Sequence, residues 1–259
     1  MSAIHQEHER VIFSFLKHLN EQSENFILKG GTALLACYGL DRFSEDIDLD
    51  GVHGKGEDIK SIVESFCKEN NYSFRTAKET ATVKRYMINY GETGKPLKVE
   101  TSFRRVEIAP EEVRKKNGIM VYDIDTLCMM KSSAYAGRDK IRDLYDLSFI
   151  CNKHHDSLSA QTIAFARNAV EHKGIEQFDY IVRQQEDALI DKDKLASDFL
   201  LMYEKLGLLY DEREKSIVQS LQEKPSLESQ LNAAAEVIGN TPTSESIEHS
   251  TSRDEEERQ

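Results

Sequence analysis

Two aspartates separated by one residue are the first feature of this sequence that could do chemistry. Asp46-Ile47-Asp48-Leu49-Asp50 alternates acidic and apolar residues, which is typical of a β-strand with its acids on one face. Residues i and i+2 of a strand share a face, so the carboxylates of Asp46 and Asp48 would lie within reach of one cation. Adjacent carboxylates repel each other, and hard oxygen ligands suit Mg²⁺. The pattern predicts a divalent-metal site, although an Asp-x-Asp pair at a strand end can also be simply solvated.

A pair of glycines lies shortly before the aspartates. Gly30-Gly31-Thr32 follows the apolar run 26–28 and leads into the apolar segment 33–38, which gives the order strand, glycine turn, helix. Free backbone N–H groups and the positive end of the helix dipole would bind phosphate oxygens there, and Thr32 could add its hydroxyl. The alternative is an ordinary tight turn. The sequence lacks the Gly-Lys-Ser/Thr ending of a Walker A loop and the third glycine of a Rossmann fingerprint. Phosphate beside a metal indicates a nucleoside triphosphate.

A second group of charged residues follows about a hundred positions later. Lys131, Tyr135 and Arg138 are spaced i, i+4 and i+7, which would place a lysine and an arginine on one helix face to meet a triphosphate or an RNA phosphate. Asp143 and Asp146, three residues apart, could orient these cations. The alternative is a structural network of ion pairs at a helix junction.

Two sequence blocks, in order, carry a family resemblance. The first is LKGGTAL at 28–34 followed by RFSEDIDL at 42–49, and the second is KSSAYAGR at 131–138 followed by RDLYDL at 142–147. Together they resemble the AbiEii/MenT nucleotidyltransferases, the toxins of type IV toxin–antitoxin systems, within the DNA polymerase β-like nucleotidyltransferase superfamily. The resemblance covers roughly residues 20–200.

The resemblance implies a Mg²⁺-dependent enzyme, with Mn²⁺ as a possible substitute, that moves a nucleoside monophosphate from an NTP to an acceptor and releases pyrophosphate. Implied catalytic residues are Asp46, Asp48, Lys131 and Asp143. Implied nucleotide-binding residues are Gly30, Gly31, Thr32, Ser44, Arg138 and Asp146. The superfamily's mechanism needs a third acid, for which we choose Glu100 beside Asp46 and Asp48 as a metal ligand, although a glutamate in an exposed alternating strand is often an ordinary solvent-facing residue.

The acceptor and partners are also implied by the resemblance. An RNA such as the 3′ end of tRNA would be the acceptor, and a cognate antitoxin would relieve the growth arrest that results. Two alternatives remain open. The same fold could modify a small molecule such as an aminoglycoside, or a protein side chain. The chain could instead be a non-catalytic module that binds nucleotide and recruits a partner through its acidic tail.

Helices and strands alternate in the first half of the predicted structure, whereas the second half is helical. The apolar periodicity predicts helices at 4–19, 33–38, 57–70, 125–136, 140–152, 159–170, 175–189 and 194–210. Strands are predicted at 26–28, 46–50, 72–76, 83–90 and 97–103, the last two forming a hairpin. The expected fold class is α+β: a nucleotidyltransferase-like α/β domain with a mixed sheet at 1–122, a helical domain at 123–210, and an acidic tail at 211–259. The tail would be partly helical, at 216–221 and 230–238, and then disordered.

Charge narrows the choice of partner. The net charge is -12, but 12 acidic and 5 basic residues lie in 211–259, whereas 104–142 has nine basic and six acidic residues. We therefore do not expect long DNA as a partner, while one RNA end or a nucleotide is compatible with the basic segment 104–142, which could also be a solvated surface. The sequence has no apolar run long enough to span a membrane, and its four scattered cysteines lack zinc-ligand spacing. We expect a cytoplasmic protein with reduced thiols and no membrane partner.

Overall fold

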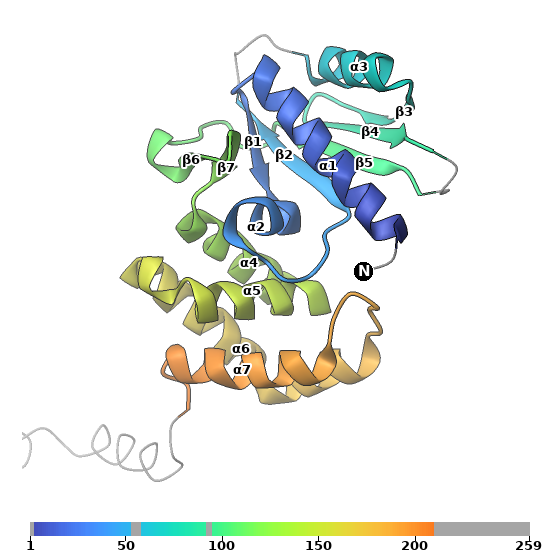
Figure 1. The fold of residues 1–259 in the computed structure, drawn as a ribbon. Coiled ribbons are helices and arrows are strands. Elements are labelled where there is room, and N and C mark those ends of the chain that lie inside the picture. The colour runs from blue at the N-terminus through green and yellow to red at the C-terminus, as the bar shows by residue number, and fades with distance from the viewer. Residues whose placement is uncertain (1–2, 53–57, 92–94, 210–259) are drawn as a thin grey trace, which may run out of the picture. The chain divides into compact units, whose positions relative to one another are not determined.

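A mixed β-sheet organises the part of the chain that the computed structural model describes, residues 3–52, 58–91 and 95–209 (Figure 1). Its strand order is β3-β4-β5-β2-β1-β7-β6. The strands are β1 (Phe26–Lys29), β2 (Asp46–Gly51), β3 (Ser73–Glu79), β4 (Val83–Asn89), β5 (Leu97–Ser102), β6 (Val113–Lys116) and β7 (Ile119–Tyr122). β2 pairs in parallel with β5, and β1 in parallel with β7, whereas the other neighbours are antiparallel. The predicted α+β class with a mixed sheet is confirmed.

Helices cover the sheet and continue beyond it. They are α1 (Ala3–Gln22), α2 (Gly30–Tyr38), α3 (Ile59–Asn70), α4 (Ile124–Gly137), α5 (Ile141–Lys153), α6 (Ala160–Gln184) and α7 (Lys192–Lys205). In Figure 1, α1 and α2 lie in front of the sheet, and α4 to α7 gather below it. Of the apolar stripe predicted for the first helix, Val11, Ile12, Phe15, Leu16 and Leu19 are buried in the core, whereas Ile4 is exposed. None of the helices in the described ranges has the length and apolar character that crossing a membrane requires.

The boundaries differ from expectation in ways that have local causes. The glycine pair forms the first turn of α2 instead of preceding it, and Gly39 ends this helix in the left-handed conformation, as predicted. The predicted break between residues 170 and 175 is present as a kink in α6, where Gly174 (φ +70°) is not helical, and the second part ends at Gln184, five residues before the predicted end. The predicted boundary at residue 122 lies between β7 and α4, inside the compact unit that ends at Leu209, and it stays a prediction. The predicted tail helices and disorder fall outside the described residues.

The hairpin of β6 and β7 was not predicted. Its turn consists of Asn117 (φ +51°) and Gly118 (φ +79°), both in the left-handed region. An Asn-Gly pair at such positions is typical of a two-residue hairpin turn, because both residues tolerate positive φ. The sequence therefore contained the signal, but the three consecutive charged residues before the turn, Arg114 to Lys116, hide the pattern of the first strand.

Candidate active site

The two carboxylates of Asp46 and Asp48 lie on one face at the start of β2. In the register with β5, Asp46 lies opposite Lys98 and Asp48 opposite Glu100. The Lys98 Nζ is 2.8 Å from an Asp46 oxygen and 3.8 Å from an Asp48 oxygen. The two acids therefore share one face and contact one cation, as the strand pattern predicts. The cation beside them is Lys98, which no sequence motif indicated.

The pKa values of Asp48 and Lys98 reflect the electrostatics of this site. Burial raises the pKa of Asp48, and the charges of Asp46 and Glu100 raise it further, while Lys98 and Lys29 oppose the shift. Burial alone would lower the pKa of Lys98, but its hydrogen bond to Asp46 and the charges of the three carboxylates raise it. One lysine thus compensates only part of the negative charge. These residues fit a divalent cation, because two oxygen-ligand side chains face the same space and retain an excess of negative charge.

Glu100 is held by another cation. Its carboxylate lies 2.5 Å from Arg85, its partner in the register of β4 and β5. In the described ranges, no three His, Cys, Asp or Glu side chains are gathered as a metal site. The proposed place of Glu100 as a third metal ligand stays a prediction, and it would require the carboxylate to leave Arg85.

The glycine pair brings the start of α2 against the Asp-x-Asp strand. A Cβ at Gly30, where φ is +76°, would lie 3.2 Å from an oxygen of Asp48. A Cβ at Gly31 would lie 2.9 Å from Ser44 Oγ and 3.0 Å from the Arg42 guanidinium. The residue before the helix, Lys29, makes no side-chain cap, so the first backbone N–H groups keep their capacity to bind an anion.

Thr32 has a role that differs from the direct contact expected. Its side chain is buried, and its hydroxyl donates a hydrogen bond to the backbone carbonyl of Asp46 and lies 2.9 Å from Ser44 Oγ. Thr32 therefore ties α2 to the start of β2. Ser44, in contrast, lines the cleft described below.

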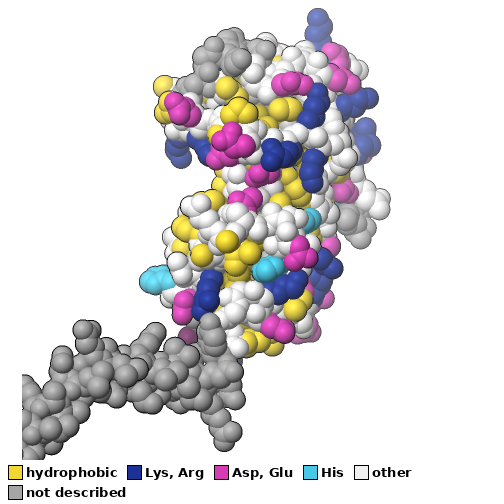
Figure 2. Space-filling model, turned by 90° about the vertical axis from the view of Figure 1, so that its left-hand side faces the viewer, with side chains coloured by type: hydrophobic (Ala, Val, Ile, Leu, Met, Phe, Trp, Pro, Cys, Tyr) yellow, Lys and Arg dark blue, Asp and Glu magenta, His cyan; other side chains and the backbone are white. Residues whose placement is uncertain are grey.

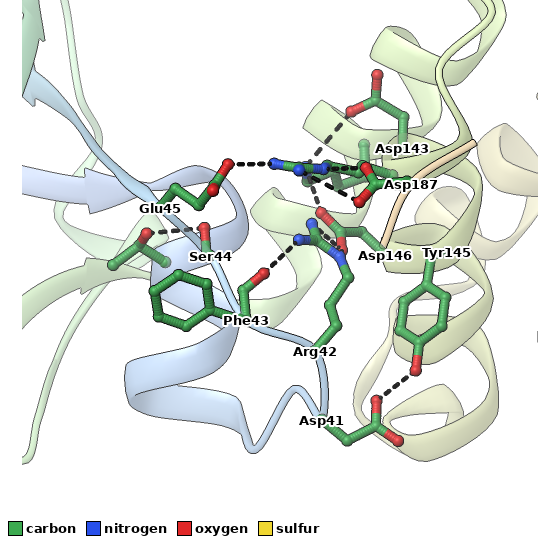
Figure 3. A network of polar contacts seen from close by, with 12 residues as sticks. Asp41, Arg42, Phe43, Ser44, Glu45, Asp143, Tyr145, Asp146 and Asp187 are labelled. Carbon is green, nitrogen blue, oxygen red and sulfur yellow. Dashed lines mark hydrogen bonds and ion pairs between the residues drawn. The ribbon is translucent and has the colours of Figure 1, made fainter. Parts of the chain in front are cut away.

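A buried carboxylate joins the second sequence block to the first (Figure 3). Asp146, on α5, is fully buried and lies 2.5 Å from the Arg42 guanidinium and 2.6 Å from the Lys131 ammonium. Arg42 comes from the segment before β2, and Lys131 from α4. Asp146 is thus shielded from solvent by two cations, so any effect that it has on a nucleotide passes through them. Sequence reasoning missed Arg42, although it begins the RFSEDIDL segment.

Asp143 brings the two predicted cations together. Its carboxylate lies 2.6 Å from Arg138 Nε and 3.5 Å from the Lys131 ammonium. The hydrogen bond to Asp143 raises the pKa of Arg138, against a smaller effect of burial, and the charge of Asp48 contributes. The expected helix face was wrong in detail, because Tyr135 is fully buried and Arg138 lies just past the end of α4 in an extended conformation.

These groups line one polar cleft of about 980 Å³. Acids from β2 and β5 form one side, together with Gly31 and Ser44, and Lys131, Arg138 and Asp143 form another. Arg142 crosses between them: its guanidinium lies 3.1 Å from Glu45 and 2.5 Å from Asp187. The pKa of Glu45 is lowered: although burial alone would raise it, Lys95 and Arg142 outweigh this effect. The cleft therefore has the volume and charge for a nucleotide with its phosphates.

Charge elsewhere on the surface is mixed. Figure 2 shows Lys and Arg side chains interspersed with Asp and Glu over one face, not collected in a single block. This agrees with the many ion pairs between oppositely charged surface side chains, such as Lys115 with Glu24 and Arg105 with Glu112. In the cleft, by contrast, the two carboxylates of Asp46 and Asp48 exceed the charge of Lys98 beside them. On the helical side, Lys131 and Arg138 meet at the carboxylate of Asp143.

Comparisons with known proteins agree on a family. Residues 14–254 match the family described as nucleotidyl transferase AbiEii toxin, type IV TA system. The crystal structure of JHP933 from Helicobacter pylori is 27% identical, with a TM-score of 0.66 over 86% of this chain and 100% of that chain. A second Helicobacter pylori structure, of a protein assigned as a nucleotidyltransferase, is 26% identical, with a TM-score of 0.63 over 82% of this chain and 100% of that chain. No curated protein matches the chain.

We predict that Gly31→Ala weakens nucleotide binding. The added Cβ would displace Ser44 or Arg42 at the entrance of α2, at a cost of about 1–3 kcal/mol in stability. Gly137→Ala is the matched control, since a Cβ there meets nothing within 4 Å. Calorimetric titration with NTP and chemical unfolding should show a loss for Gly31→Ala and none for the control. Equal NTP affinity in both variants would remove Gly31 from the binding site.

We predict that Asp146→Asn strongly destabilises the fold. The change leaves Arg42 and Lys131 buried without their carboxylate, which costs about 3–5 kcal/mol. Asp179→Asn breaks the exposed pair with Arg183 on α6 and should cost less than about 0.5 kcal/mol. Urea unfolding measures both variants. A similar small loss in both would show that the Asp146 network is not what holds these elements together.

Proposed function

The chain belongs to the AbiEii family of nucleotidyl transferase toxins of type IV toxin–antitoxin systems, and we propose that its cleft transfers a nucleoside monophosphate from a Mg²⁺-bound NTP to the end of an RNA. The observation that carries the proposal is the pairing of two kinds of charge across one cleft. Carboxylates of Asp46 and Asp48 lie on the sheet side, and the cations Lys131 and Arg138 lie on the helical side.

This division suits a metal–triphosphate substrate. Asp46 and Asp48 would hold a divalent ion, which when bound neutralises charge on the phosphates and on the reacting oxygens. The first-turn N–H groups of α2 at Gly31 would bind phosphate oxygens, since the N-cap residue Lys29 makes no side-chain cap. Lys131 and Arg138, held in place by Asp143, would neutralise the leaving pyrophosphate.

The reaction is a substitution at the α-phosphorus. The bond from the acceptor oxygen to phosphorus forms, the bond to pyrophosphate breaks, and the proton of the acceptor hydroxyl passes to solvent water. Asp143 and Asp146 act as positioning residues in this account, because both carboxylates are buried against the cations that would meet the substrate. Arg142 would hold the segment at Asp187 against Glu45 and so limit the width of the cleft.

The acceptor and partner are proposed from the family. An RNA end, such as the 3′ end of tRNA, would receive the nucleotide, and a cognate antitoxin would relieve the resulting toxicity. Incubation with labelled NTP and total RNA, an aminoglycoside panel or a protein extract identifies the acceptor by which species carries label. Label on RNA supports the proposal, and label on a small molecule or a protein would replace it.

We predict that Asp48→Asn reduces transfer by about a thousand-fold while raising thermal stability. The variant loses a ligand for the cation, which contributes several kcal/mol to such reactions, but it also removes a carboxylate whose charged form is disfavoured by burial and by its neighbours. Glu79→Gln, at an exposed position of β3, is the charge-matched control. Transfer of label from [α-³²P]NTP and a thermal melt at pH 7 measure both effects. Retained transfer, with retained toxicity on expression, would remove the catalytic role.

We predict that Mn²⁺ or Mg²⁺ raises the melting temperature of the wild-type chain and does not change the melting temperature of the double variant Asp46→Asn/Asp48→Asn. Binding to the native state alone stabilises it, and protons compete with the metal for Asp48. Because the pKa of Asp48 is raised, protons displace the metal at a higher pH than they would at an ordinary aspartate. As the pH falls, the metal-induced rise in melting temperature should therefore disappear above the usual pKa of an aspartate. Melting curves across a pH series test this. An equal shift in the double variant would place the metal elsewhere.

A further inference from the structure

Two rows of side chains run across the sheet from the Asp-x-Asp pair to its edge strand. The register of β2, β5, β4 and β3 aligns Asp46, Lys98, Met87 and Arg75 in one row. It aligns Asp48, Glu100, Arg85 and Lys78 in the second row. Residues paired across neighbouring strands project from the same face. Each row therefore begins at the proposed catalytic carboxylates and ends on a cation three strands away.

The far ends of both rows are exposed and unpaired. Arg75 and Lys78 are solvent-exposed residues of β3, and neither has a carboxylate partner among the described residues. The other bases of β4 and β5 are engaged: Lys84 with Asp58, Arg85 with Glu100, and Lys98 with Asp46. The opposite face of the same strands packs Phe74, Tyr86 and Ile88 against the core. The two unpaired cations, Arg75 and Lys78, thus lie on the open face. We call this surface the β3–β4 face and define it by Arg75, Lys78, Arg85 and Met87.

We propose that the β3–β4 face binds the backbone of a single-stranded RNA whose 3′ end lies at Asp46 and Asp48; this rests on the proposed function. A transferase needs its acceptor to approach the carboxylate pair, and this face extends the cleft, since Arg85 lines the cleft beside Lys98 and Glu100. Unpaired cations on a protein of net charge -12 suit a polyanion that is drawn to one local surface. Met87, between Lys98 and Arg75, offers an apolar contact for a base.

The dimensions agree with a short strand. Neighbouring β-strands lie about 4.8 Å apart, so the three steps from β2 to β3 span about 14 Å. Stacked nucleotides advance about 3.4 Å per phosphate along one strand, so this distance matches about four nucleotides. Single strands are commonly held by a positive groove that follows the phosphates without reading the bases.

The basic segment 104–142 is a less suitable surface. Its strand β6 is at the opposite edge of the sheet from β3. Most of its cations near β6 have partners: Arg105 pairs with Glu112 at 2.5 Å, Lys115 with Glu24 at 2.5 Å, and Arg114 with Asp123 at 3.6 Å. The charge counted along the sequence is therefore largely compensated in space.

The test compares two double variants with the same change in charge. Arg75→Gln/Lys78→Gln alters the β3–β4 face, and Arg114→Gln/Lys115→Gln alters β6. Fluorescence anisotropy with a labelled 12-nucleotide RNA, without NTP, gives the Kd over a range of salt. We expect Arg75→Gln/Lys78→Gln to weaken RNA binding about tenfold, with the β6 variant near wild type. Each lost phosphate contact lowers the slope of log K against log salt by about 0.7, so the loss of two contacts should lower it by about 1.4.

Kinetics separate this inference from the proposed function. With labelled NTP, Arg75→Gln/Lys78→Gln should raise the KM for RNA, with unchanged KM for NTP and unchanged kcat at saturating RNA, because both residues are remote from the phosphates of NTP. If the wild-type chain labels no RNA, the RNA proposal fails while the binding comparison still decides this inference. Equal RNA affinity and salt slope in Arg75→Gln/Lys78→Gln and the wild type, or greater weakening by the β6 variant, would overturn it.

Discussion

The buried contact of Asp146 with Arg42 and Lys131 is the interaction on which the rest of the site depends. It joins three segments that are far apart in the chain: the stretch before β2, helix α4 and helix α5. A buried carboxylate needs cations around it, and buried cations need the carboxylate, so each element is fixed relative to the others. The same contact also fixes the position of the Lys131 ammonium at the cleft.

The fixed frame places the Asp46–Asp48 pair on one side of the cleft and the cations Lys131 and Arg138 on the other. On the sheet side, the strand register places Asp46 and Asp48 beside Lys98, which compensates only part of their charge. On the helical side, Asp143 holds Lys131 and Arg138. A substrate that carries both a cation and phosphates complements both sides at once. The placement of two carboxylates opposite two cations, more than any single residue, connects the fold to nucleotidyl transfer.

Local patterns in the sequence predicted the features that depend on local geometry. The alternation at Asp46-Ile47-Asp48 needed only the two-residue period of a strand, and the position of Gly39 at the end of α2 needed only its freedom at positive φ. The contacts of Lys98 and Arg85 depend on the pairing of strands, and those of Arg42 on a residue 104 positions away, so no local pattern indicated them. For the same reason, the sequence did not show that several cations of the basic segment 104–142 are paired with carboxylates and so less available to bind RNA.

Transfer of a nucleoside monophosphate requires that the bond between the α-phosphorus and pyrophosphate breaks and that the α-phosphorus stays on the acceptor. Parallel incubations of the wild-type chain with Mg²⁺, RNA and either [α-³²P]NTP or [γ-³²P]NTP test it most directly. We expect label from the α position to stay on the acceptor and label from the γ position to appear only in pyrophosphate. Label transferred from the γ position to the acceptor, or none transferred from the α position to any acceptor, would contradict it.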